Sequence, residues 1–133
     1  MTVGCVLDAS AVLALLQAEP GWEAVLARVE QGGCSISAMN VTEVLTRLID
    51  RGLSGSDADA AFDALELTVS AFDDAAARAC AALRPATRGL GLSMGDRACL
   101  ALAQARQLPA LTADRAWAQL DCGVVVEQIR SPI

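Results

Sequence analysis

The sequence predicts an α/β protein, a single-domain α/β/α sandwich with a mostly parallel sheet of about five strands. Short apolar runs alternate with longer segments of helical character along the chain. The chain has 133 residues, of which 54% are hydrophobic, which suits one domain with one core. No repeat or linker interrupts the pattern, so we expect residues 1–133 to form one domain.

In the amino-terminal half, most elements have a clear boundary residue. The first strand ends in Asp8, and a helix follows directly. The second helix begins at Pro20, which suits a first helical turn, and ends before Gly32. A later helix takes Asn40 as its cap and Gly52 as its stop. The expected order is strand 2–8, helix 9–18, helix 20–31, strand 34–37, helix 40–52 and helix 56–66.

The carboxyl-terminal half continues the alternation with an Ala-rich helix, a loop rich in Pro and Gly, and a helix that opens on Asp96. A right-handed crossover between successive strands makes them parallel and places helices on both faces of the sheet. The expected order is strand 67–72, helix 73–84, loop 85–95, helix 96–107, strand 109–114 and strand 123–129.

Missing residue types exclude several classes of site. The sequence has no His and no Lys. Without His, neither a Ser–His–Asp triad nor a Cys–His pair can form, and a His/Cys zinc site is not expected. Without Lys, there is no phosphate-loop lysine and no Schiff base.

Charge and aromatic content bear on nucleic-acid binding. The net charge is −6, which argues against binding through a broad basic surface. Aromatic residues make up 3%, too few for a base-stacking platform. A local group of arginines, or metal ions that neutralise the acids, would still allow contact with a nucleic acid.

The compartment follows from cysteines and hydropathy. The five cysteines form no CxxC pair and lie among apolar residues, which favours reduced, buried thiols. No apolar run reaches the roughly 18 residues that span a bilayer, and the start does not read as a secretory leader. We therefore expect a cytoplasmic protein with no membrane partner.

Four acids are predicted to meet at one edge of the sheet. Asp8 and Asp114 follow strands, so they lie at the carboxyl ends of those strands. Glu43 and Asp96 lie in first turns of helices, and the helices of right-handed crossovers begin at that same edge. Open α/β sheets bind ligands there.

Each acid also has a purely structural interpretation. Asn40 with Glu43, and Ser93 with Asp96, have the spacing of capping boxes. Asp8 and Asp114 could be helix N-caps, and Glu43 could pair with Arg47 one turn later. Convergence of four segments on one edge favours a shared site over four separate caps.

Clustered carboxylates need a counter-ion. Two like charges about 4 Å apart at an effective dielectric near 20 repel by about 4 kcal/mol. An all-oxygen site without His or Cys favours Mg²⁺ or Mn²⁺, the ions of metal-assisted phosphodiester hydrolysis.

Neighbouring polar residues could support such a site. Ser10 and Thr112 could hydrogen-bond the acids or metal-bound water, although either could serve a turn instead. Arg97 and Arg115 directly follow two of the acids and could contact a phosphate or a partner. Neutralising the neighbouring acids is an equally good role for both arginines.

Four segments resemble, in this order, the motifs of PIN-domain ribonucleases: VLDASAVLALL, NVTEVLTRL, LSMGDRACLALA and ALTADRAW. The closest likeness is to VapC-type toxins of bacterial toxin–antitoxin modules. The ordered set is specific, whereas LDAS or TAD alone is weak. The match is poor from about Gly52 to Thr87, so this segment indicates nothing about the substrate.

The resemblance implies a PIN-like fold and an endoribonuclease that hydrolyses RNA phosphodiester bonds with a Mg²⁺- or Mn²⁺-activated water. It implies a homodimer and a cognate antitoxin that blocks the site with a helix and a basic residue. The metal-binding, catalytic acids would be Asp8, Glu43, Asp96 and Asp114, supported by Ser10 and Thr112.

Two other functions fit an acidic pocket on such a sheet. A phospho-acceptor domain of the response-regulator type would normally need a Lys at the sheet edge, and the chain has none. A catalytically silent binding module, acting only through association with a partner, stays open because caps and metal ligands use the same residue types.

Overall fold

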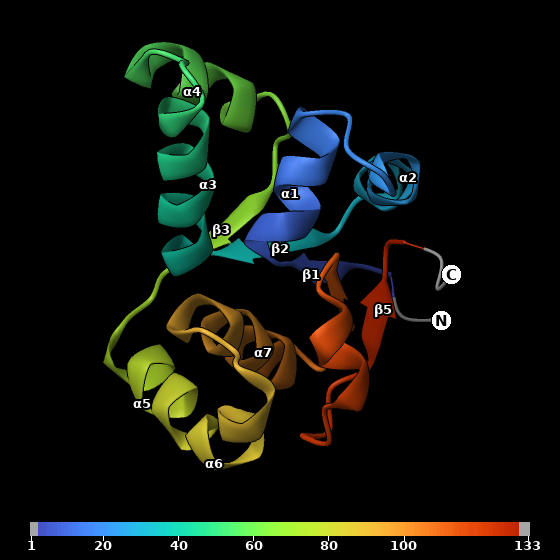
Figure 1. The fold of residues 1–133 in the computed structure, drawn as a ribbon, viewed down its shortest axis with the longest axis vertical. Coiled ribbons are helices and arrows are strands. Elements are labelled where there is room, and N and C mark those ends of the chain that lie inside the picture. Colours follow the sequence, from blue (N-terminus) through green and yellow to red (C-terminus); the bar gives the residue numbers. More distant parts are fainter. Residues whose placement is uncertain (1–2, 131–133) are drawn as a thin grey trace.

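The computed structural model describes residues 3–130, and Figure 1 shows its helices and strands. Thr2, which the first predicted strand included, lies outside the described residues. The strands are β1 (Cys5–Leu7), β2 (Cys34–Ser37), β3 (Thr68–Ser70), β4 (Ala110–Thr112) and β5 (Val126–Gln128). The α-helices are α1 (Ala9–Leu16), α2 (Trp22–Gln31), α3 (Ala38–Asp50), α4 (Gly55–Asp63), α5 (Asp74–Ala82), α6 (Arg84–Thr87) and α7 (Met94–Arg106). The 3-10 helices are η1 (Arg88–Leu90) and η2 (Arg115–Gln119).

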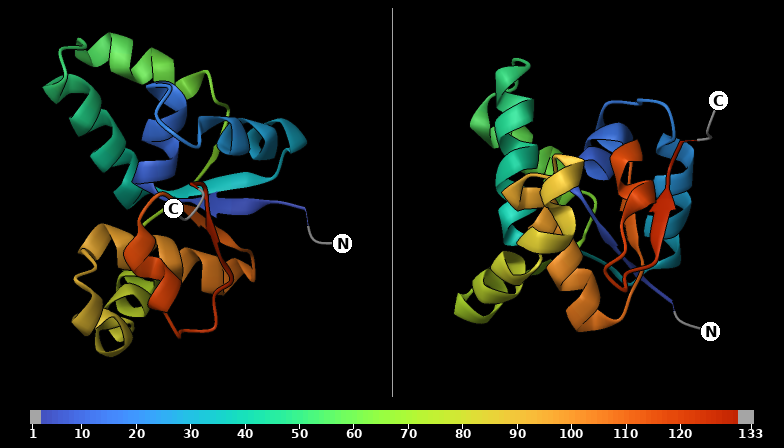
Figure 2. Two further views of the ribbon diagram at one scale, coloured as in Figure 1. Left: turned by 45° about the vertical axis from the view of Figure 1, so that its right-hand side comes forward. Right: turned by 60° about the horizontal axis from the view of Figure 1, so that its bottom comes forward.

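The strands form one sheet in the order β3-β2-β1-β4-β5, and every pairing is parallel. Helices α1 to α4 lie on one side of the sheet, and α5 to α7 lie on the other (Figures 1 and 2). The α/β/α class, the number of strands and their parallel direction are therefore confirmed. Strand β1 lies at the centre of the sheet and is fully buried.

Two apolar clusters fill the space between the sheet and its two helical layers. Side chains alternate across a strand, so Cys5 and Leu7 belong to the cluster with α1 and α3. Val6 belongs to the other cluster, which includes Leu100 and the buried Trp117. Burial on both faces explains why β1 is continuously apolar in sequence.

The cysteines are free thiols, as expected, and four of the five are buried while Cys122 is only partly buried. Cys5 and Cys34 are neighbours in β1 and β2, with their sulfurs 3.3 Å apart. Among residues 3–130, no helix has the length and apolar character needed to cross a membrane.

Several predicted boundaries differ from the structure, and three of these errors have a clear physical reason. Helix α2 begins at Trp22 rather than Pro20, because Gly21 adopts a left-handed backbone conformation (φ 94°) that breaks the helix. Helix α3 begins at Ala38, where the Ser37 hydroxyl accepts a hydrogen bond from the Met39 backbone, so Asn40 is not the cap. The Ser37 cap lets the helix start directly from the end of β2.

The predicted loop 85–95 is the third error, since it contains most of α6, all of η1 and the start of α7. Pro85 is compatible with a helix here because it lies in the first turn of α6, where its missing N–H has no helical partner. Thr87 is fully buried and donates its hydroxyl hydrogen to the Leu83 carbonyl, 2.9 Å away. Helix η2 was not predicted.

Candidate active site

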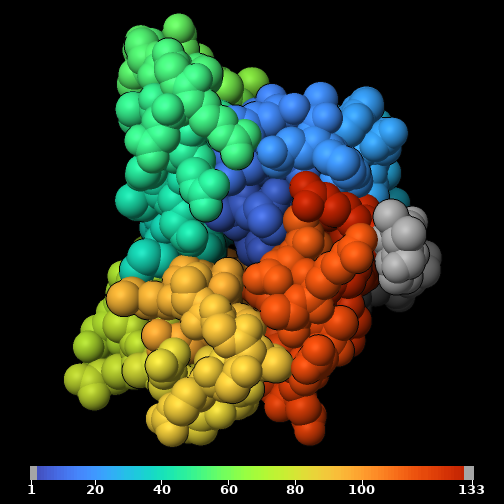
Figure 3. Space-filling view, viewed as in Figure 1, coloured from blue at the N-terminus to red at the C-terminus, as the bar shows by residue number. Residues whose placement is uncertain are grey.

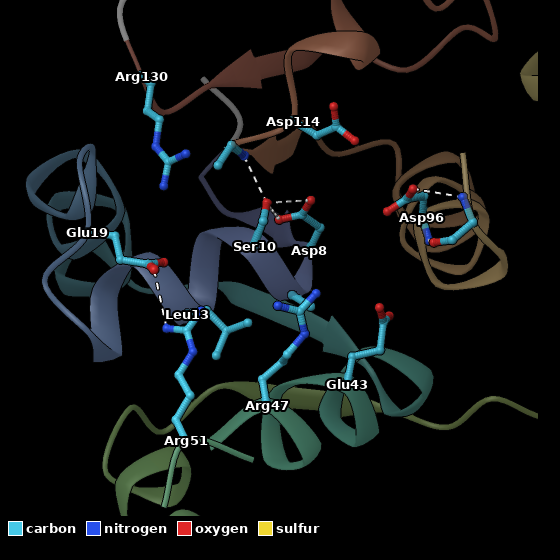
Figure 4. A pocket seen from close by; sticks show the side chains of 13 residues that line it. Asp8, Ser10, Leu13, Glu19, Glu43, Arg47, Arg51, Asp96, Asp114 and Arg130 are labelled. Atoms are coloured by element: carbon cyan, nitrogen blue, oxygen red, sulfur yellow. Dashed lines mark hydrogen bonds and ion pairs between the residues drawn. The ribbon is translucent and has the colours of Figure 1, made fainter. Parts of the chain in front are cut away.

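An open pocket of about 530 Å³ lies where β1 and β4 end and where α3 and α7 begin. Figure 3 shows this face of the molecule, on which α1, α3, α7 and the segment after β4 surround a hollow. Figure 4 shows the pocket from close by. Its lining includes Asp8, Ser10, Glu19, Glu43, Arg47, Arg51, Ser93, Asp96, Asp114 and Arg130.

Asp8 is the buried floor of the pocket, with 3% of its surface exposed. As the N-cap of α1, it accepts a 2.8 Å hydrogen bond from the Ala11 backbone. The Ser10 hydroxyl donates to both of its oxygens, at 2.8 and 2.9 Å, and the Thr112 hydroxyl donates at 2.5 Å. These bonds fix the carboxylate and tie the start of α1 to the end of β4.

The two hydroxyl groups are themselves oriented by the backbone after β4. The Ala113 N–H donates to Ser10 Oγ at 2.9 Å, and the Asp114 N–H donates to Thr112 Oγ1 at 3.0 Å. Each hydroxyl therefore accepts from the backbone and has its hydrogen available for Asp8. Ser10 and Thr112 thus orient Asp8, the supporting position predicted for them.

Burial raises the pKa of Asp8 from its ordinary value of 3.8 to about 6. The bonds from Thr112, Ala11 and Ser10 lower the pKa, but they do not offset the loss of solvation. The negative charge of Asp96 raises it further. Asp8 is thus a well-oriented carboxylate whose ionised form is disfavoured by burial.

Asp96 is held by a capping box at the start of α7, as predicted. The Ser93 N–H donates to Asp96 Oδ2 at 2.8 Å, and the Asp96 N–H donates to Ser93 Oγ at 3.2 Å. Burial raises the pKa of Asp96, and the charge of Asp114 raises it further. One side chain therefore caps the helix and also faces the pocket (Figure 4).

Glu43 is oriented by contacts between α3 and α7. The buried Asn40 amide donates to Glu43 Oε1 at 2.7 Å and to the Gly95 carbonyl at 3.0 Å. A Cβ atom at Gly95 would overlap the Glu43 carboxylate where it now lies, so a larger residue there would displace that carboxylate. Asn40 and Gly95 are positioning residues that the sequence did not reveal, because Asn40 has the local appearance of a cap.

Two structural alternatives for Glu43 are wrong in this fold. The Asn40–Glu43 pair is not a capping box, since α3 starts before Asn40, and Glu43 therefore lies in the second turn of α3 rather than in the first turn as predicted. Within residues 3–130, Glu43 forms no ion pair with Arg47, although the Arg47 charge lowers the pKa of Glu43. Burial outweighs that effect, so the Glu43 pKa is raised overall.

Asp114 is the most exposed of the four acids and caps η2. Its Oδ1 accepts a hydrogen bond of 2.9 Å from the Ala116 backbone, and its carboxylate faces the pocket (Figure 4). The cap interpretation of Asp114 is therefore correct, and the position at the pocket edge is correct as well.

The carboxylates act on one another electrostatically. Asp96 raises the pKa of both Asp8 and Glu43, and Asp114 raises that of Asp96. The buried Cys99 thiol has its pKa raised, first by burial and then by the charges of Asp8, Asp96 and Glu43. The acids therefore form one charged cluster with Asp96 at its centre.

The donor set suits a hard divalent cation, because every candidate ligand in the pocket is a carboxylate oxygen. As the side chains stand, however, no three Asp, Glu or Cys groups in the described part of the chain are arranged to hold a metal ion. Cation binding would require the less buried acids to turn toward the fixed Asp8.

The two predicted phosphate-contacting arginines do not line the pocket. The Arg97 guanidinium donates to the Cys80 carbonyl of the α5 layer at 3.2 Å, and Arg115 is exposed at the start of η2. Three other arginines line the pocket instead, namely Arg47, Arg51 and Arg130. The only sequence signal was the spacing of Arg47 and Arg51, one and two turns after Glu43.

The PIN domain family matches residues 5–122 of the chain. The chain belongs to the PIN-domain family. The match contains all four pocket acids and the segments that orient them. No curated protein matches the chain significantly.

Solved structures share this PIN fold. The DNA-bound VapBC of Salmonella typhimurium has a TM-score of 0.77 at 18% identity, over 96% of this chain and 99% of that chain. VapBC-5 of Mycobacterium tuberculosis, a toxin–antitoxin system, has a TM-score of 0.58 at 26% identity, over 98% and 100%. VapC20 of Mycobacterium tuberculosis, a toxin that cleaves the sarcin–ricin loop, has a TM-score of 0.66 at 16% identity, over 90% and 98%. This PIN domain is therefore similar to VapC-type toxins along nearly its whole length.

Proposed function

We propose that this PIN domain is a Mg²⁺- or Mn²⁺-dependent endoribonuclease and the toxin of a type II toxin–antitoxin pair. The observation that carries the proposal is the pocket, to which four separate segments each contribute a carboxylate and in which burial raises the pKa of Asp8, Glu43 and Asp96. Such a cluster is unfavourable until a cation neutralises it. An acidic, open pocket fits a phosphodiester substrate only when a cation is present.

The comparisons support the reaction class. The chain belongs to the PIN-domain family, and the similar VapC20 protein cleaves an RNA loop. The absence of His and Lys leaves carboxylates as the chemically useful groups in the pocket. RNA hydrolysis through a carboxylate-bound cation is therefore the chemistry that best fits these residues.

The proposed ligands are Asp8, Glu43, Asp96 and Asp114. A cation bound there would lower the pKa of a water molecule and offset the negative charge of the phosphate. Asp8 provides the fixed point, since three groups hold its carboxylate. Asp96 and Glu43 each have one oxygen held by a neighbour, which leaves the other free for the pocket.

The supporting residues act by orientation. Ser10 and Thr112 direct their hydroxyl hydrogens at Asp8, and Asn40 directs its amide at Glu43. These groups donate hydrogen bonds to carboxylate oxygens and therefore favour the ionised form that a cation needs.

The proposed partners are a cognate antitoxin and a second copy of the chain. Similar proteins were solved as VapBC complexes, which supports an antitoxin. A basic antitoxin residue could neutralise the acidic pocket in place of a cation. An RNA substrate implies action in the cytoplasm.

A catalytically silent binding module is the competing function, and RNA cleavage separates the two. Asp8→Asn and Asp96→Asn should each lower Mg²⁺- or Mn²⁺-dependent RNA cleavage at least about 100-fold, since even outer-shell groups cost 10–100-fold. Cleavage of end-labelled RNA on denaturing gels, with and without EDTA, measures this.

The control is Asp59→Asn, which changes an exposed acid on α4 outside the pocket. It should cleave like the parent, and circular dichroism should show that all three variants are folded. Equal cleavage by the parent, Asp8→Asn and Asp96→Asn would leave only the silent module.

A further inference from the structure

The pocket has a basic part as well as an acidic part. Arg47, Arg51 and Arg130, which we call the arginine rim, line the pocket on the side away from Asp96, where Glu19 lies between Arg51 and Arg130 (Figure 4). Arg47 lies one turn after Glu43 on α3, Arg51 caps the carboxyl end of that helix, and Arg130 follows β5. Segments far apart in sequence thus place three guanidinium groups beside the acids.

Arg47 acts on Glu43 only through its charge, and no direct contact with the described residues fixes its guanidinium. Within residues 3–130, its guanidinium forms no hydrogen bond or ion pair, and the side chain is exposed. In Figure 4 it extends from α3 into the pocket toward Asp8 and Ser10. A free guanidinium at the boundary between the acids and the rim is available to a ligand.

The other two rim residues each use one nitrogen of the guanidinium group in contacts with the protein. Arg51 Nη1 donates to Gln17 and pairs with Glu19 at 3.4 Å. Arg130 Nε donates to the Pro20 carbonyl at 2.7 Å. The remaining nitrogens of both guanidinium groups form no hydrogen bond in the described part of the chain. Each group is therefore held in one orientation while its other N–H donors stay available.

Phosphate is the ligand that this geometry suits. Guanidinium groups bind phosphate oxygens through paired N–H donors. With a net charge of −6, the chain as a whole repels a polyanion, so RNA must be held by a few local cations. A bound divalent ion would neutralise the acids but would not hold the strand on either side of the cleaved bond.

We infer that the arginine rim is a binding subsite for RNA backbone phosphate, next to the phosphate that is cleaved, with Arg47 as its principal contact. The inference rests on the proposed function, because it takes the acidic part as the place of cleavage. The strand would then run from the acids, past Arg47, toward Arg51 and Arg130.

The test is RNA affinity in the Asp96→Asn background, which prevents cleavage during the titration. A fluorescein-labelled, short single-stranded RNA of mixed sequence is titrated with full-length protein in Mg²⁺, and anisotropy gives Kd at several salt concentrations. Arg47→Gln should raise Kd about 5- to 10-fold. It should also reduce the slope of log Kd against log salt concentration by about 0.7, the value of one phosphate contact on a single strand.

Two further variants make the test specific. Arg88→Gln removes an exposed arginine of η1 outside the pocket and should leave Kd and the slope near those of the background. Arg47→Lys keeps the positive charge but not the paired N–H donors of the guanidinium group. It should therefore restore the salt dependence of Kd while recovering only part of the affinity.

The outcomes separate this inference from the proposed function. If the parent chain cleaves RNA but Arg47→Gln and Arg88→Gln bind it equally well, the subsite is wrong, and Arg47 serves a protein partner instead. If the parent does not cleave RNA but Arg47→Gln still weakens binding, Arg47 contacts RNA phosphate and the nuclease proposal fails.

Discussion

At the scale of single residues, the pocket uses the same side chains for folding and for the site. Asp8 and Asp114 are N-caps, and Asp96 completes a capping box, yet all three line the pocket. Cap and ligand are therefore not alternatives. A helix that begins at the carboxyl edge directs its first-turn carboxylates toward that edge, so one geometry serves both purposes.

Gly95→Ala tests the positioning of Glu43. The new Cβ would overlap the Glu43 carboxylate and displace it. Because Ala is favoured over Gly in a helix by about 1 kcal/mol, the fold should keep or gain stability. We expect Mn²⁺ affinity, measured by calorimetry, and RNA cleavage each to fall about 10-fold.

The matched control is Gly55→Ala, at the first residue of α4, where nothing lies within 4 Å of the added Cβ. It should change neither affinity nor cleavage. Parent-like Mn²⁺ affinity in Gly95→Ala would show that Glu43 does not contribute to the cation site.

At the scale of elements, the starts of α3 and α7 together build half of the acidic cluster. Asn40, in the first turn of α3, links the two helices by bonding Glu43 in the second turn of α3 and Gly95 in the first turn of α7. The Ser93 cap fixes where α7 begins and therefore where Asp96 lies. Small shifts of either helix start would separate the acids.

Ser93→Ala and Ser54→Ala compare two caps that differ in what they position. Each removes an N-cap hydroxyl that accepts a backbone N–H three residues later, from Asp96 or from Asp57. Each should cost about 1 kcal/mol of unfolding free energy, measured with urea. Only Ser93→Ala should also reduce RNA cleavage, by roughly 10-fold, because only its helix carries a pocket acid. Equal cleavage by the two variants would contradict the role of the Ser93 cap.

At the scale of the whole molecule, the pocket stores unfavourable electrostatic energy. Asp8, Glu43 and Asp96 all have raised pKa values, with burial as the first cause in each case. A folded state with raised carboxyl pKa values binds protons more tightly than the unfolded chain. Its stability therefore falls as the pH rises through the window between the two values.

For Asp8 that window runs from its ordinary value of 3.8 to about 6. In EDTA, the unfolding free energy of the parent relative to Asp8→Asn should fall by about 3 kcal/mol across this window and then level off. Urea unfolding of both proteins from pH 4 to pH 7.5 measures the difference.

Added Mg²⁺ or Mn²⁺ should raise the parent's Tm at pH 7.5 by mass action and have little effect at pH 4, where Asp8 is protonated. A pH-independent difference between parent and variant would contradict the raised pKa, and an unchanged Tm in millimolar metal would contradict the cation site.

The sequence by itself determined the alternation of elements, the parallel sheet and the edge where the four acids lie. These follow from local signals, because apolar runs mark buried strands and the crossover rule brings their ends together. The helices at 84–90 escaped detection, since a segment rich in Pro and Gly has the composition of a loop and its burial depends on distant residues.

Only the tertiary structure decided which side chains complete the pocket. Thr112 reaches Asp8 across 104 positions, and Asn40 reaches Gly95 across 55. Arg97 and Arg115 were named for their adjacency to acids, yet Arg47, Arg51 and Arg130 line the pocket. Position in sequence fixes where a backbone passes, but the direction of a side chain depends on helix phase and on partners from distant segments.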